Sequence, residues 1–146
     1  MFREERSTLI QVIAMTQRTE NTGTDRSGHA PEGMHESLVR FQAKHPGWET
    51  VSEHGAEKLR KQYEFSSFDA AIAFAEALLY LGKAEGHHPV IRLERNTMRV
   101  FITWWTKEIN GIHHRDLTMA RETDRMFDLS SVNVWSDATA ATHRTV

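Results

Sequence analysis

The spacing of apolar residues between positions 66 and 86 constrains the fold more than any other feature of this sequence. The apolar residues that recur three or four positions apart are Phe68, Ile72, Ala75 and Leu79. This period is that of an α-helix with one buried face. Ser66, with Asp69 three positions later, resembles a capping box, and Gly86 weakens the other end. We therefore expect a long helix in this segment.

Alternating polar and apolar residues on both sides of this helix predict two pairs of strands. The predicted strands are 48–51, 59–65, 90–93 and 98–106. Apolar residues around 38–43 and 117–127 predict a first and a last helix. The order α-β-β-α-β-β-α is typical of an α+β fold, so we expect a four-stranded antiparallel sheet with helices packed on one face.

The fourth predicted strand should divide its side chains between the two faces of the sheet. Met98, Ile102 and Trp104 share one face, and Trp105 and Lys107 share the other. We expect Trp104 in the core. Trp105 would stack on a flat heterocycle or form a sheet or subunit contact.

The two ends of the chain differ in composition from its centre. Residues 16–32 are rich in Thr, Asn, Gly, Asp and Ser and contain almost no apolar side chains, so burial cannot offset the entropy of ordering them. We expect a flexible leader over 1–32, one folded domain over 33–127 and a C-terminal tail over 128–146.

The overall composition excludes several classes of protein. The formal net charge of −2 gives no basic excess for binding nucleic acid directly, and no apolar run approaches the roughly 20 residues that span a bilayer. The absence of cysteine excludes disulfides and thiolate zinc sites. We expect a cytoplasmic protein, although arginines in the leader leave organelle import open.

The motif His87-His88-Pro89 follows the central helix directly. Imidazole is the side chain with an unperturbed pKa nearest neutrality, so a histidine pair at this corner suits acid/base chemistry. A plainer interpretation is a capping or surface feature, because cations are favoured at a helix C-terminus. A metal site is disfavoured, because adjacent residues face different ways and no third ligand is close in sequence.

The stretch from Trp48 to Phe127 resembles the pterin-4a-carbinolamine dehydratases, also called 4a-hydroxytetrahydrobiopterin dehydratases. That family shows an acidic helix end, His-His-Pro, a hairpin, Thr-His, a Gly-Leu turn, and an aspartate that opens the last helix. The corresponding residues here are Glu85, His87, His88, Pro89, Thr106, Lys107, Gly111, Ile112 and Asp116. Upstream matches are Gly47-Trp48, Tyr63-Glu64-Phe65 and Phe68-Asp69-Ala70-Ala71.

The resemblance implies dehydration of 4a-hydroxytetrahydrobiopterin to quinonoid dihydropterin, in support of tetrahydrobiopterin recycling. The reaction needs a general acid and a general base, and no metal or other cofactor, since the pterin is the substrate. The resemblance makes His87 and His88 the acid/base pair, with Lys107 as a third contact. The expected substrate-binding residues are Glu85, Pro89, Trp105, Thr106 and Asp116.

The sequence departs from the family at two positions. Lys107 replaces the third histidine, and Lys83 stands where an acidic residue is common. Lys107 is either a solvated lysine at the end of a strand or a donor that replaces an imidazolium. His113 and His114 either precede the last helix as polar residues or supply the missing imidazole.

The loss of the third histidine also suits a rival hypothesis, a non-catalytic dimerisation or assembly module that binds a protein partner. The resemblance supports both, since one family member is a dimerisation cofactor of a homeodomain transcription factor. We expect a homodimer or homotetramer, formed through an edge strand or the Leu78-Leu79-Tyr80 face of the central helix. A pterin binder without turnover is a third possibility.

Overall fold

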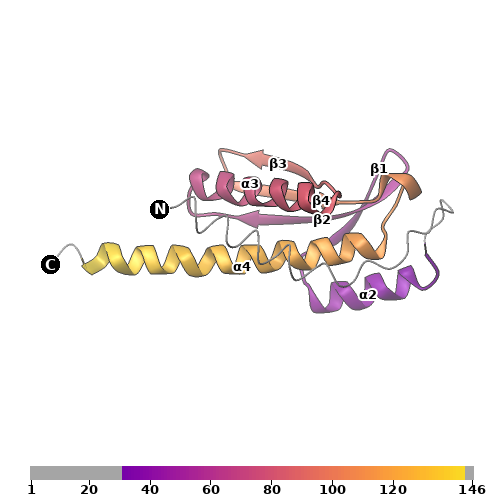
Figure 1. Cartoon of the computed structure of the whole chain (residues 1–146), viewed down its shortest axis with the longest axis horizontal. Helices are drawn as coiled ribbons and strands as arrows, with labels where there is room; N and C mark the ends of the chain where they lie inside the picture. Colours follow the sequence, from indigo (N-terminus) through magenta and orange to yellow (C-terminus); the bar gives the residue numbers. More distant parts are fainter. Residues whose placement is uncertain (1–30, 144–146) are drawn as a thin grey trace.

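The computed structural model describes residues 31–143, with side chains described through residue 130 (Figure 1). All but the last two residues of the predicted leader lie outside this range. The elements are α2 (Met34–Lys44), β1 (Glu49–Glu53), β2 (Ala56–Glu64), α3 (Phe68–Glu85), β3 (Val90–Glu94), β4 (Arg99–Trp104), the 3₁₀ turn η1 (Lys107–Ile109) and α4 (His114–His143). The predicted order of helices and strands is confirmed.

The four strands form one antiparallel sheet in the order β1-β2-β4-β3. Strands β2 and β4 are neighbours at its centre, although α3 and β3 lie between them in sequence. Their register pairs Leu59 with Trp104 and Tyr63 with Val100. These paired side chains point to the same face, and all four are buried.

The helices cover the face that carries these buried side chains. Tyr63 of β2 packs on Phe74 of α3 and on Phe127 of α4, with ring centroids 5.1 and 4.9 Å apart. Helix α4 also contacts α2 and β4. The predicted antiparallel sheet with helices on one face is therefore confirmed, and the opposite face carries polar pairs such as Arg60 with Thr103.

The start of α3 differs from the prediction by one residue. Ser67, in an extended conformation, is the N-cap, and its hydroxyl accepts a hydrogen bond from the Ala70 amide at 3.1 Å. Ser66 lies one position too early for this role. Gly86 ends the helix in the left-handed conformation, at φ 62°.

The fourth strand is shorter than predicted at both ends. Met98 has φ 53° and belongs to the turn before β4, and the strand ends at Trp104. A bridge between Thr106 and Gly111 then closes a loop around η1, which begins at Lys107. Lys107 is thus an exposed turn residue, and its predicted place on a strand face is wrong.

The last helix is longer than predicted. It begins at His114 and continues to His143, through most of the segment predicted as a tail (Figure 1). Small and polar residues such as Ser130-Ser131 and Ala138-Thr139-Ala140-Ala141-Thr142 suggest a tail, yet residues 128–143 contain no proline or glycine to stop a helix. No helix within residues 31–143 is long and apolar enough to cross a membrane.

A carboxylate on α4 ties this helix to the sheet. Asp124 Oδ1 accepts hydrogen bonds from the Tyr63 hydroxyl at 2.5 Å and from Lys61 Nζ at 2.7 Å. Its Oδ2 accepts from Trp48 Nε1 at 3.1 Å and lies 3.4 Å from His45 Nδ1. Burial, together with the hydrogen bond to Asp124, raises the pKa of the Tyr63 hydroxyl well above its usual range.

This shift predicts a specific loss of stability in alkali. Above pH about 10 the unfolded chain releases the Tyr63 proton while the folded chain keeps it, so the unfolding free energy falls by about 1.4 kcal/mol per pH unit. Tyr63→Phe should remove this part of the slope in chemical denaturation between pH 9 and 11. Tyr80→Phe, at a side chain that is 56% exposed, is the control and should keep it. Equal slopes in wild type and Tyr63→Phe would contradict the assignment.

Candidate functional site

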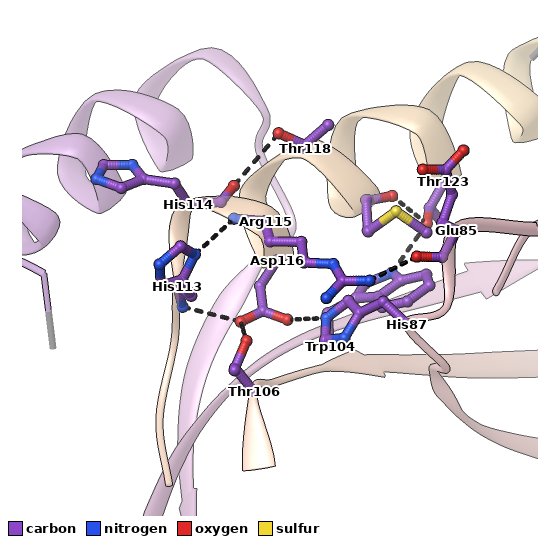
Figure 2. A network of polar contacts seen from close by, with 11 residues as sticks. Glu85, His87, Trp104, Thr106, His113, His114, Arg115, Asp116, Thr118 and Thr123 are labelled. Carbon is purple, nitrogen blue, oxygen red and sulfur yellow. Dashed lines mark hydrogen bonds and ion pairs between the residues drawn. The ribbon is translucent and has the colours of Figure 1, made fainter. Parts of the chain in front are cut away.

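The centre of the candidate site is a contact between the turn after α3 and the first turn of α4. His87 Nε2 lies 2.5 Å from Asp116 Oδ1 (Figure 2). The Asp116 side chain is fully buried and that of His87 is 10% exposed. A buried carboxylate therefore fixes an imidazole that still reaches the surface at one edge.

The second oxygen of Asp116 is also occupied. Oδ2 accepts hydrogen bonds from Thr106 Oγ1 at 2.7 Å and from the backbone amide of His113 at 2.8 Å. The hydrogen bond from the His113 amide caps the start of α4, where a negative charge is favoured. One carboxylate thus connects the α3–β3 turn, the loop after β4 and the start of α4.

Trp104 orients the His87 ring from one face. The two ring centroids are 5.5 Å apart and the rings are inclined by 26°. Trp104 is itself fully buried, and its Nε1 donates to Thr123 Oγ1 at 3.0 Å. The Thr123 hydroxyl donates in turn to the Met119 carbonyl at 2.7 Å. This chain of contacts holds the stacking partner of His87 still.

The contact with Asp116 bears on the roles of the two ring nitrogens. When the carboxylate is ionised it can only accept hydrogen bonds, so Nε2 is then the donor and, in the neutral ring, Nδ1 carries a lone pair. Among the described residues, Nδ1 of His87 has no hydrogen-bond partner. The geometry is that of a general base oriented by a carboxylate.

Gly82 lets the histidine turn approach α3 closely. A Cβ at this buried position would lie 3.0 Å from the His87 carbonyl oxygen, 3.0 Å from Pro89 Cδ and 3.2 Å from His88 Cα. The Gly82 carbonyl also accepts the His87 amide at 3.0 Å. A glycine that weakens a helix on propensity grounds is therefore required here by packing.

Arg115 is a second contact between α4 and the end of α3. Its Nη2 donates to the Glu85 carbonyl oxygen at 2.5 Å. Burial raises the pKa of the Glu85 carboxyl, an effect that the nearby Arg115 charge opposes and the Glu122 charge reinforces. The roles of Gly82, Arg115 and Thr123 are not predicted from the sequence, because they depend on contacts between segments that the fold brings together.

The structure brings only some of the predicted site residues together. Glu85, His87, Thr106 and Asp116 meet through the contacts described above, and Pro89 is buried against Gly82. His88 and Lys107 are exposed. Of the two alternatives for Lys107, its exposure fits the solvated lysine.

Trp105, predicted to contact the substrate, and the His113-His114 pair, considered as a replacement for the missing imidazole, lie away from His87. Trp105 lies under Lys58, with Nζ 4.4 Å from the ring centroid, and Lys58 belongs to the sheet face opposite to that of Trp104. His113 and His114 lie on the other side of the Asp116 carboxylate from His87 (Figure 2). His113 Nδ1 accepts the Arg115 amide at 3.3 Å.

No group of three or more His, Asp or Glu side chains within the described residues is arranged to hold a metal ion. The contacts of Asp116 with His87 and Thr106 make the site suitable for proton transfer by an oriented imidazole.

Comparison with known proteins identifies a family for this chain. The family model described as pterin 4 alpha carbinolamine dehydratase matches residues 30–126. The chain belongs to this family. A protein of Microcystis aeruginosa, provisionally named pterin-4-alpha-carbinolamine dehydratase, is 36% identical over 102 residues, which are 70% of this chain and 85% of the relative.

Two further relatives extend the comparison. A provisionally named pterin-4-alpha-carbinolamine dehydratase of Chlorobaculum tepidum is 34% identical over 112 residues, 77% of this chain and 99% of the relative. The crystal structure of a transcriptional coactivator/pterin dehydratase from Brucella melitensis has a TM-score of 0.55 and 24% identity, and covers 67% of this chain and 97% of its own. The latter likeness shows the shared fold.

Replacing Gly82 should disturb the histidine turn of this dehydratase-family chain. Gly82→Ala places a methyl group against backbone atoms, and the shift that relieves the clash should cost about 1–3 kcal/mol of unfolding free energy despite the better helix propensity. Chemical denaturation measures this. Lys83→Ala, at the exposed neighbouring position, should change stability by less than about 0.5 kcal/mol. A stabilised Gly82→Ala protein would contradict the packing argument.

Asp116→Asn tests the buried carboxylate. The amide cannot accept from His87, Thr106 and the His113 amide at once, so we expect a loss of about 1–3 kcal/mol in unfolding free energy. Asp128→Asn, an exposed change on the same helix, is the matched control and should be near neutral. Equal stability of the two variants would show that the Asp116 network contributes nothing.

Proposed function

We propose that this chain catalyses the dehydration of a 4a-hydroxytetrahydropterin to the quinonoid dihydropterin. The observation that carries the proposal is the His87 ring, held by Asp116 and Trp104 with Nδ1 left unengaged by the described residues. Membership of the pterin 4 alpha carbinolamine dehydratase family supplies the substrate class. The physiological substrate that we propose is 4a-hydroxytetrahydrobiopterin.

In the proposed mechanism, His87 is the general base. Its Nδ1 lone pair takes the proton from N5 of the pterin, and Asp116 stabilises the imidazolium that forms. His88, the next residue in the chain, is exposed, and in this mechanism it donates a proton to the 4a-hydroxyl, which leaves as water. One proton is taken up and one is given back, so the pair returns to its starting state through exchange with solvent.

The remaining predicted residues have supporting places in this proposal. Thr106 fixes Asp116, and Pro89 sets the direction of the histidine pair through its contact with Gly82. Glu85 shapes the same turn from the end of α3. Trp105 lies against Lys58 and Lys107 is an exposed turn residue, so a substrate contact for either one rests on the family resemblance alone.

The assay follows dehydration of freshly generated 4a-hydroxytetrahydropterin by absorbance. His87→Ala should lower turnover about 10²–10⁴-fold, since it removes the base. Lys107→His should raise turnover, because it restores an imidazole next to Thr106. Lys44→His, an exposed change at the end of α2, is the matched control and should leave turnover unchanged.

The unfolding temperatures of the His87→Ala and Lys107→His variants separate an effect on catalysis from an effect on stability. Each variant should be compared with wild type by thermal unfolding at the assay concentration. Wild-type protein that gives no rate above the spontaneous reaction, together with an equally inactive Lys107→His variant, would rule out the dehydratase proposal.

The second candidate function is a non-catalytic assembly module. It is favoured by exposed apolar side chains on α3 and on the edge strand β3, namely Leu79, Tyr80 and Val90, which are 52–56% exposed. We propose that a second copy of the chain covers this surface in a homodimer or homotetramer. If the chain is an assembly module, this oligomer also binds another protein. Sedimentation of wild type and of a Leu79→Glu variant measures this.

The cytoplasmic location remains a prediction from the sequence.

A further inference from the structure

We infer that Arg115 is a positioning residue for His87, acting through the last carbonyl of α3. This inference rests on the proposed function only in taking His87 as the general base. The contact itself is a feature of the fold. Arg115 Nη2 donates to the Glu85 carbonyl at 2.5 Å, two residues before His87 in the chain.

The Glu85 carbonyl is one of the helix-end acceptors that lack a partner within the helix. Gly86, in the left-handed conformation at φ 62° and ψ 28°, turns the chain away at this point, and the amides of Gly86 and His87 both donate to the Gly82 carbonyl. Arg115 reaches across from α4 and supplies a donor to the Glu85 oxygen. Its Nη2 would be 3.8 Å from a Cβ at Gly86, so the guanidinium lies directly against the turn.

Arg115 and its neighbour Asp116 therefore hold the same short segment at two points. Asp116 holds the ring of His87 through Nε2, and Arg115 holds the backbone that carries this ring (Figure 2). The Gly82 carbonyl binds the His87 amide and Trp104 stacks on the His87 ring, and Arg115 adds a contact from α4 to the carbonyl directly before the turn. Two contacts from adjacent residues of one helix fix both the ring and its attachment, and so fix the direction in which Nδ1 points.

The guanidinium suits this role better than an ammonium would. It is planar and presents several donors in a fixed arrangement, so one N–H can bind the carbonyl while the group keeps its place against Gly86. Arg115 is exposed at the surface, so its removal leaves no buried charge without a partner. The expected effect is therefore a loss of orientation at His87 with the fold intact.

The test uses ¹⁵N spectra of the His87 ring in the full chain, with turnover measured beside it. In wild type we expect a ring with the proton on Nε2. Arg115→Ala should give a mixture of tautomers and faster exchange of the Nε2 proton, and Arg115→Lys should restore the spectrum in part. A displaced base should also lower kcat about tenfold or more with KM nearly unchanged.

Two control variants separate positioning from general stability. Arg121→Ala removes another exposed arginine of α4, and should leave the His87 spectrum unchanged. Asp124→Asn weakens the attachment of α4 to the sheet away from the turn. A His87 spectrum unchanged in Arg115→Ala, or altered equally by Asp124→Asn, overturns the inference. Altered spectra in Arg115→Ala alone support it, and this holds even if the wild-type protein shows no turnover, a result that would remove only the proposed reaction.

Discussion

The buried carboxylate of Asp116 is the group on which the arrangement of the site depends. It accepts from the His87 ring, from the Thr106 hydroxyl and from the His113 amide, and these donors belong to three separate segments. Without a side-chain acceptor at this point, the three donors would be desolvated without compensation. The same carboxylate therefore satisfies the His113 amide at the start of α4 through Oδ2 and orients the imidazole through Oδ1.

Helix α4 carries this carboxylate and also the groups that keep the helix in place. Thr123 binds the Trp104 indole, on which His87 stacks, and Asp124 binds Lys61, Tyr63 and Trp48 on the strand side. These residues follow Asp116 by about two helical turns. Position along one helix thus links the packing of the core to the geometry of the site, because a shift of α4 would move every one of these partners together.

The sequence predicted the fold well because its elements are marked by local periodicity. The apolar spacing in α3 and the alternation in β2 and β4 gave the confirmed order, and Trp104 lies in the core as its strand face requires. Errors occurred where a local pattern continued past its structural end. Alternation extended the predicted fourth strand to Thr106 and placed Lys107 on its face, whereas the strand ends at Trp104 and the bridge between Thr106 and Gly111 closes a loop there.

The candidate site was predicted in part. His87 and Asp116 were named from motifs, and their contact required the fold to bring together residues far apart in sequence. The roles of Gly82 and Arg115 could not be read from the chain, because a close backbone approach and a side chain that reaches a distant carbonyl leave no periodic signal.

The sequence by itself determined the order of the helices and strands and which residue types were available for proton transfer, since both follow from local spacing and side-chain chemistry. Only the tertiary structure decided which nitrogen of His87 is held, which face of its ring is covered, and that Lys107 is exposed. The two properties of His87 depend on which side chains from distant segments meet against α4, and the exposure of Lys107 depends on the bridge between Thr106 and Gly111.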